Sequence, residues 1–292
     1  MLLDRSIFFE IIFQCYSLSN FIFVYFVMKR FNHTLTVISI LFLVSCAPSP
    51  SEIDTLYQAG KFNETIKAIN KRLFFHSGEI KMLHTRARSF EELGELDKAR
   101  DDYNRILDND PSNAQAYAGV GKILFEQGHY EIADLKILKA ASLDPENFEI
   151  IYLAGRSQLM VKNWERAEIF LLKALEMKPD YAPIYYYTGM ARASQGDLLG
   201  AASAFNMYLS KEPDNLAARY NRGFAMMKIG YLPWALEDFE FVLKNKPDHT
   251  EALARKGLCL ARMGNPEGCQ LLQEAATKGS DFALSSLDEF CL

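Results

Sequence analysis

The side chains with the most distinctive chemistry in this sequence are its five cysteines. Two lie near the start, Cys15 and Cys46, and three lie near the end, Cys259, Cys269 and Cys291. Zinc sites use cysteine and histidine ligands at short, recurring spacings. The last three cysteines are widely and unevenly spaced and no histidine accompanies them, so the spacing does not favour a metal site. We therefore expect no bound metal and no cofactor.

Cys46 ends a segment with the order of a secretory signal peptide. Two basic residues follow Met28, an apolar run covers residues 35–44, and the small residue Ser45 stands directly before Cys46. Basic, apolar and small residues in this order are typical of a chain that is exported. The sequence therefore predicts a signal peptide at residues 28–45.

The tetrapeptide Leu43-Val44-Ser45-Cys46 resembles the lipobox of bacterial lipoproteins. In that family the cysteine thiol takes a diacylglycerol thioether, and a peptidase then cuts just before the cysteine. The resemblance implies that Cys46 is lipidated and becomes the first residue of the mature chain. Two or three acyl chains are enough for stable anchoring in a membrane. Ala47 after the cysteine implies the outer membrane, with the chain facing the periplasm.

Residues 6–27 form a second apolar segment, for which a transmembrane helix is the alternative interpretation. This segment is long enough to span a bilayer but contains Glu10 and Gln14, and the run at 35–44 is too short to span. We favour residues 1–27 as an over-extended gene start, so that residues 1–45 as a whole form a leader.

Three residue types recur at one constant interval after the leader. The prolines are Pro111, Pro145, Pro179, Pro213 and Pro247. The glycines are Gly121, Gly155, Gly189, Gly223 and Gly257. The alanines are Ala99, Ala133, Ala167, Ala201 and Ala235. A common period in three residue types indicates an internal repeat.

This period resembles the tetratricopeptide repeat, whose unit is a helix–turn–helix of about 34 residues. We number the positions of each unit from its first residue, which is residue 80, 114, 148, 182, 216 or 250. The residue at position 8 makes the close contact between the two helices, and the small residue at position 20 faces it. Position 15 lies in the turn between the helices, where glycine adopts a left-handed conformation. Position 24 is a large apolar side chain that fills the space between the helices, and position 32 is the proline. Lys162 departs from this pattern at position 15. In the last unit Cys269 is the small residue at position 20, and Gln273 departs at position 24.

The resemblance implies an all-α fold, a right-handed superhelical solenoid of about six to seven helix–turn–helix units. Residues 46–79 would form an atypical first repeat, with a first helix shortened by Pro48 and Pro50. Residues 80–249 would form five regular units, and 250–292 a degenerate last repeat with a closing helix at 282–290. Irregular terminal repeats are expected because they shield the core from water.

In this family, positions 2, 5, 9, 12 and 13 of the first helix face a concave groove. Here the middle and C-terminal part of the groove is lined by tyrosine, phenylalanine and methionine between charged ends, and aromatic and methionine side chains are typical of adaptable peptide-binding surfaces. The predicted groove residues are Phe125, Tyr152, Arg156, Met160, Tyr186, Met190, Tyr220, Phe224 and Met227. Ordinary packing against neighbouring helices is the alternative interpretation.

Some members of the family bind the C-terminal carboxylate of a partner with a set of five lysine, asparagine and arginine residues. Asn221 and Arg255 match that set at two sites, whereas Tyr186, Met190 and Glu251 stand at the other three. A carboxylate at Glu251 would repel a second one, so we expect no such clamp.

An oxidising periplasm permits a disulfide between two of the last cysteines. Cys269 lies early on the last repeat's second helix, and Cys291 ends the closing helix. Because these helices are joined near Gly279 and should be antiparallel, the two Cα atoms can come within bonding range. We predict a Cys269–Cys291 bridge, with Cys259 as a buried filler.

No catalytic motif is present, and the five histidines are scattered over the chain. A net charge of −5 gives no basic footprint for nucleic acid. We therefore predict a lipid-anchored scaffold, not an enzyme, that binds one or more envelope proteins or peptide segments. The alternative is a periplasmic, holdase-like chaperone that binds extended segments of many clients in the groove.

Overall fold

The computed structural model describes residues 48–291, and these residues form fifteen α-helices and no β-strand. The predicted all-α repeat fold is therefore confirmed. The described residues divide into two compact units, one ending at Pro111 and one beginning at Ser112. The predicted signal peptide, the lipobox and Cys46 lie outside the described residues. Among the described helices, none combines the length and the apolar character needed to cross a bilayer.

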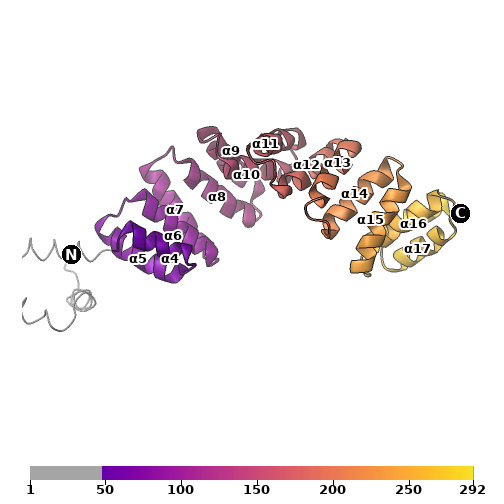
Figure 1. Ribbon diagram of the computed structural model, residues 1–292, viewed down its shortest axis with the longest axis horizontal. Helices are drawn as coiled ribbons and strands as arrows, with labels where there is room; N and C mark the ends of the chain where they lie inside the picture. The colour runs from indigo at the N-terminus through magenta and orange to yellow at the C-terminus, as the bar shows by residue number, and fades with distance from the viewer. Residues whose placement is uncertain (1–47, 292) are drawn as a thin grey trace, which may run out of the picture. The chain divides into compact units, whose positions relative to one another are not determined.

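The first unit consists of two helical hairpins (Figure 1). Its helices are α4 (Pro50–Gln58), α5 (Phe62–Phe75), α6 (Ile80–Glu92) and α7 (Leu96–Asn109). A bidentate ion pair joins Arg86 of α6 to Asp102 of α7, with a distance of 2.7 Å from Nε to Oδ2. The same guanidinium donates to Asn70 of α5, so one half-buried arginine connects three helices.

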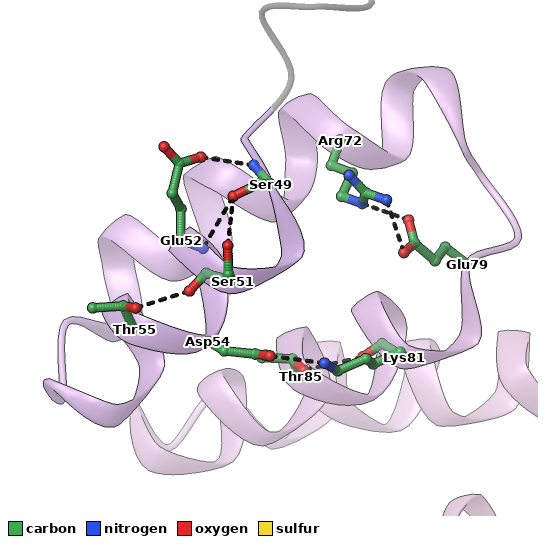
Figure 2. A network of polar contacts seen from close by, with 9 residues as sticks. All are labelled: Ser49, Ser51, Glu52, Asp54, Thr55, Arg72, Glu79, Lys81 and Thr85. Atoms are coloured by element: carbon green, nitrogen blue, oxygen red, sulfur yellow. Dashed lines mark hydrogen bonds and ion pairs between the residues drawn. The ribbon is translucent and has the colours of Figure 1, made fainter.

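Helix α4 is short because its start is fixed by a capping box rather than because prolines interrupt it. Ser49 accepts a hydrogen bond from the backbone N–H of Glu52 at 3.2 Å, and the Glu52 carboxylate accepts one from the Ser49 N–H at 2.7 Å (Figure 2). Pro50 occupies the first helical turn, where its missing N–H costs nothing. Pro48 lies before this helix and Pro50 is its first residue, so neither proline interrupts it. The ion pair between Lys81 and Asp54, at 2.7 Å, links α4 to α6.

The second unit continues as a succession of hairpins closed by a single helix (Figure 1). Its helices are α8 (Ala114–Glu126), α9 (Tyr130–Leu143), α10 (Phe148–Met160), α11 (Trp164–Met177), α12 (Ala182–Gln195), α13 (Leu198–Leu209), α14 (Leu216–Lys228), α15 (Leu232–Asn245), α16 (Thr250–Arg262), α17 (Glu267–Thr277) and α18 (Asp281–Phe290). Each helix packs on the next, and the successive first helices of the hairpins, α8, α10, α12, α14 and α16, also contact one another. The first helices therefore share one side of this unit.

The constant repeat period follows from the packing inside each hairpin. A Cβ atom added to Gly155 would lie 2.7 Å from Leu171 Cγ, and one added to Gly189 would lie 2.8 Å from Phe205 Cε1. Each glycine thus provides space for the large side chain of the facing helix. The alanines at position 20, such as Ala167 and Ala201, are fully buried beside this contact.

The last hairpin departs from the regular period by one residue. A Cβ atom on Gly257 would lie 2.9 Å from Gly268 O and 3.1 Å from Leu272 Cγ. Gly268 therefore has the place of the small residue at position 20, and fully buried Leu272 has that of the filler. The prediction that Cys269 is the small residue at position 20 is therefore wrong, because the residues of α17 that contact Gly257 stand one position earlier in the sequence than their equivalents in the regular hairpins.

This shift turns Cys269 away from the α16–α17 contact and toward the closing helix. The structure joins Cys269 to Cys291 in a disulfide, with the two Cα atoms 5.7 Å apart. The third cysteine of this region, Cys259, is fully buried in α16, and burial raises the pKa of its thiol to about 11. Its thiol therefore stays protonated and unreactive at neutral pH.

Counting free thiols tests whether the Cys269–Cys291 disulfide forms in the protein. In a chain that starts at Ala47 and is made in an oxidising compartment, we expect titration of the denatured protein to find one thiol before reduction and three afterwards. The cysteines concerned are Cys259, Cys269 and Cys291. The variant Cys291→Ser should show two thiols without reduction. Three thiols in the unreduced wild-type chain would disprove the bridge.

The turns between the two helices of a hairpin use a left-handed residue. Glycine has this conformation at Gly94, Gly128, Gly196, Gly230 and Gly264, with φ between 73° and 90°. At the equivalent position of the α10–α11 turn stands Lys162, with φ 60°, the one non-glycine residue of positive φ in the described chain. A side chain with a Cβ atom is strained in this region.

We expect Lys162→Gly to raise the free energy of unfolding by about 0.5–1 kcal/mol, because relief of strain exceeds the added flexibility of the unfolded chain. Urea denaturation followed by circular dichroism measures the change. The matched variant is Gly128→Ala, where φ is 82° and an added Cβ atom would meet nothing within 4 Å. It should lose about 1 kcal/mol through backbone strain alone. A destabilised Lys162→Gly variant would contradict this account of the turn.

Candidate functional site

A row of three tyrosines runs along the side that the first helices share. Tyr152, Tyr186 and Tyr220 stand at the same position of successive repeats, on α10, α12 and α14. Each contacts position 6 of the next first helix. The rings of Tyr152 and Tyr187 lie 6.0 Å apart. Asn221 donates to the Tyr186 hydroxyl at 3.4 Å, and Arg255 Nε donates to the Tyr220 hydroxyl at 2.6 Å. We call the surface of α8, α10, α12 and α14 that carries this row the first-helix face.

Burial raises the pKa of two of these hydroxyls, which are neutral at physiological pH even without this shift. Desolvation is the main cause that raises the pKa of Tyr152, and the neighbouring Tyr187 adds to it. Desolvation likewise raises the pKa of Tyr186. At neutral pH both side chains therefore present an uncharged ring and hydroxyl. The first-helix face thus offers aromatic contact area and neutral hydrogen-bonding groups.

Arg156 lies among aromatic rings that come from three helices. Its guanidinium carbon is 5.3 Å from the ring centre of Phe125 on α8, 5.7 Å from that of Tyr152 on α10, and 5.2 Å from that of Tyr187 on α12. A cation within about 6 Å of a ring face is attracted by the ring's quadrupole. The three rings therefore hold the guanidinium in place by cation–π attraction.

Arg255 on α16 forms a second arginine–aromatic cluster, but its charge is paired. Its guanidinium lies 4.8 Å from the ring centre of Phe224 and 4.4 Å from that of Phe282 on α18. Its Nη2 lies 3.5 Å from Glu251, and the same carboxylate accepts a hydrogen bond from Ser280 at 2.8 Å. This cluster therefore fastens the closing helix to α16.

The predicted groove residues divide into three groups by exposure. Met160 and Met190 are exposed, at 42% and 38%. Half-buried positions are held by Phe125, Tyr152, Arg156, Tyr186, Tyr220 and Phe224. Met227 is only 2% exposed and packs into the core under α14, so its assignment to the groove surface is wrong. Phe125 stands at the same position 12 of its own repeat and remains half-buried beside Arg156, so burial at this position differs between repeats.

Two aromatic residues of the first-helix face are not among the groove residues predicted from the sequence. Tyr187 stands at position 6, which was not among the positions taken to face the groove, yet it contacts both Tyr152 and Arg156. Tyr181, just before α12, packs edge-on against Tyr152 with the ring centres 5.2 Å apart. The signal for Tyr187 was available, because Asn221 and Arg255 also stand at position 6.

A separate pocket lies between α13, α14 and α15. Its volume is about 460 Å³, and its lining includes Leu199, Met226 and Trp234 beside the ion pair of Arg222 and Asp238. Trp234 also stacks on Tyr231, with ring centres 5.5 Å apart. No first-helix tyrosine contributes to this pocket.

The described part of the chain holds no group of three or more histidine, cysteine, aspartate or glutamate side chains that could bind a metal ion. Several of its acidic residues form ion pairs on helix surfaces, such as Glu146 with Lys173 and Asp180 with Lys211. What the geometry offers is thus a surface for contact with another molecule.

Comparison with known proteins agrees with this architecture. A sequence model of the tetratricopeptide repeat matches residues 84–133 and 152–215. Small glutamine-rich tetratricopeptide repeat-containing protein 2 of Mycosarcoma maydis is 29% identical over 89 residues, which are 30% of this chain and 25% of that protein. Outer dynein arm-docking complex subunit 4 of Mus musculus is 26% identical over 96 residues, 33% of this chain and 15% of that protein. The chain thus spans a quarter or less of either curated relative.

Among solved structures, YrrB is described as a TPR protein with an unusual peptide-binding site. It superposes with a TM-score of 0.59 and 26% identity, over 64% of this chain and 97% of YrrB. The family match, the constant repeat period and the succession of hairpins together support the tetratricopeptide repeat as the building unit of this protein.

Proposed function

We propose that this protein is a lipid-anchored scaffold of the bacterial cell envelope that holds an extended segment of a partner protein on its first-helix face. The observation that carries the proposal is the continuous row of Tyr152, Tyr186 and Tyr220, with exposed Met160 and Met190 beside it. Aromatic and methionine side chains give large contact area at low entropic cost. Tetratricopeptide repeats are generally non-enzymatic binding scaffolds, and the peptide-binding site named for YrrB supports the same kind of role here.

The anchor in this proposal rests on the sequence of the leader. The order of residues from Met28 to Cys46 supports export and lipidation, and Ala47 supports the outer membrane. Cys46→Ser removes the only thiol in the lipobox. If the anchor is real, this variant moves from the membrane fraction to the soluble periplasmic fraction. A wild-type chain that is already soluble in the periplasm would disprove the anchor without affecting the binding face.

Photo-crosslinking in the cell tests the binding face. Met160 and Met190 are the positions for the crosslinker, because they are exposed and replacing them leaves the tyrosine contacts intact. Arg166, exposed on α11, is the control on a second helix. One discrete adduct from the two methionines and none from Arg166 is the expected result. Many adducts of different size would indicate the holdase-like alternative. No adduct from either methionine would contradict a binding role for this face.

A further inference from the structure

Arg156 differs from the other arginines of the second unit that reach aromatic clusters. Arg255 is paired with Glu251, and Arg219 lies 3.6 Å from the carboxylate of Asp238. Arg156 has neither a hydrogen bond nor an ion pair to any of residues 48–291, and its Nε is buried without a partner. A half-buried cation in this state is costly, because ring faces replace only part of the lost hydration.

We infer that Arg156 is the anchor for a carboxylate side chain, aspartate or glutamate, within the partner segment that lies on the first-helix face. The inference rests on the proposed function and adds the chemical class of the partner. Charge complementarity carries it, since no carboxylate of the described residues pairs with this guanidinium and its nearest neighbours are three aromatic rings. Arginine and carboxylate form paired hydrogen bonds that are among the strongest in proteins.

The three rings make Arg156 a prepared site. Phe125, Tyr152 and Tyr187 fix the guanidinium before any partner arrives, so less side-chain entropy is lost when a carboxylate binds. The surrounding aromatic groups also exclude water and strengthen the attraction between the two charges. A partner segment without an acidic residue at this place would cover the half-buried cation and leave it unpaired.

The carboxylate belongs to the interior of a segment rather than to a chain end. The aromatic surface continues on both sides of Arg156, from Phe125 on α8 to Tyr186 and Tyr220 on α12 and α14. A partner segment that uses this whole surface passes over Arg156 and continues beyond it. The set of residues that binds a terminal carboxylate in related proteins is also incomplete here, as Glu251 shows.

The test is selection of peptides by the purified protein. A library of short random peptides, capped at both ends so that no terminal charge remains, is panned on the wild-type chain and on the variants Arg156→Gln, Arg156→Lys and Arg166→Gln. Arg166 is exposed on α11 and serves as the matched control. Binders are then resynthesised with glutamine for glutamate and their dissociation constants are measured by fluorescence anisotropy.

We expect wild type to enrich aspartate and glutamate and to bind glutamate peptides about tenfold more tightly than their glutamine forms, which corresponds to about 1.4 kcal/mol. Arg156→Gln should abolish this preference but still bind apolar peptides, and Arg166→Gln should keep it. Arg156→Lys should keep part of it, because lysine retains the charge without the planar fork. The comparison of glutamate peptides with their glutamine forms uses only the wild-type protein, so it tests the inference even if a variant folds poorly.

Three results would overturn the inference. Enrichment of apolar peptides without an acidic preference would do so while leaving the proposed function intact. Binding that requires a free carboxyl terminus, measured with an uncapped copy of the library, would show that the anion is a chain end. Failure of wild type to enrich any peptide would contradict the inference and the binding function together.

Discussion

Asp238→Ala is expected to lower the free energy of unfolding by about 3–5 kcal/mol, the range for removing one partner of a buried ion pair. Asp238 on α15 is 1% exposed and accepts hydrogen bonds from Arg222 Nε at 2.9 Å and Nη2 at 2.7 Å. The hydrogen bonds to Asp238 are also the main cause that raises the pKa of Arg222. Without the carboxylate, the charge of Arg222 stays buried, and among the described residues only Asn206 still accepts a hydrogen bond from it, at 2.8 Å.

The matched control for this prediction is Asp180→Ala. Asp180 is fully exposed, and its carboxylate lies 3.1 Å from Lys211 Nζ, a distance close to that of the buried pair. Water screens such a pair, so the loss should be about 0.5 kcal/mol or less. Urea denaturation of both variants gives the comparison. Equal losses would mean that burial does not govern the strength of the Asp238 pair. Replacing both charges, as Arg222→Met with Asp238→Leu, should recover part of the stability, since Arg222 no longer leaves an unpaired charge, although Arg219 still loses the carboxylate 3.6 Å away.

The same arrangement in the first unit offers an independent check. Arg86, Asp102 and Asn70 precede Arg222, Asp238 and Asn206 by one common interval, because 222 − 86, 238 − 102 and 206 − 70 are equal. This interval is four repeat periods, so the two trios occupy equivalent positions. Asp102→Ala should therefore destabilise its own unit by a similar amount.

Gly268→Ala is the second change for which we expect a large effect, a loss of about 3 kcal/mol in the free energy of unfolding. An added Cβ atom would overlap the backbone nitrogen of Ala261 and lie 2.6 Å from Gly257 O. Both atoms belong to the backbone of α16 and cannot rotate away. Helices α16 and α17 must then separate, which exposes Leu272 and loosens the attachment of α18.

Limited proteolysis and thermal denaturation measure this effect. The variant should be cut near the α16–α17 turn and should melt at a lower temperature than wild type. Gly78→Ala is the control, because an added Cβ atom there meets nothing within 4 Å and its φ is not in the left-handed region. It should be neutral or slightly stabilising. A Gly268→Ala variant as resistant as Gly78→Ala would disprove the register proposed for the last hairpin.

The sequence alone determined the features that depend on contacts inside one repeat. Gly155 and Leu171 face each other within a single hairpin, so the pattern recurs in every unit and is visible as a period. The left-handed turn is also a local constraint, which is why glycine at position 15 predicted the positive φ of Gly128 and Gly230. Lys162 is the exception in residue type at position 15, and its φ of 60° shows that the turn imposes the same conformation on it.

The tertiary structure decided what depends on contacts between repeats. Phe125 and Tyr187 stand in the repeats before and after that of Arg156, and only the packing of α8, α10 and α12 brings the rings around the cation. The register of α17 also depends on tertiary packing. The backbone at Gly257 leaves room only for another glycine opposite it, so the small residue of α17 is at position 268 instead of 269. A period counts positions along the chain, whereas burial of Met227 or exposure of Met160 depends on how much of each helix its neighbours cover.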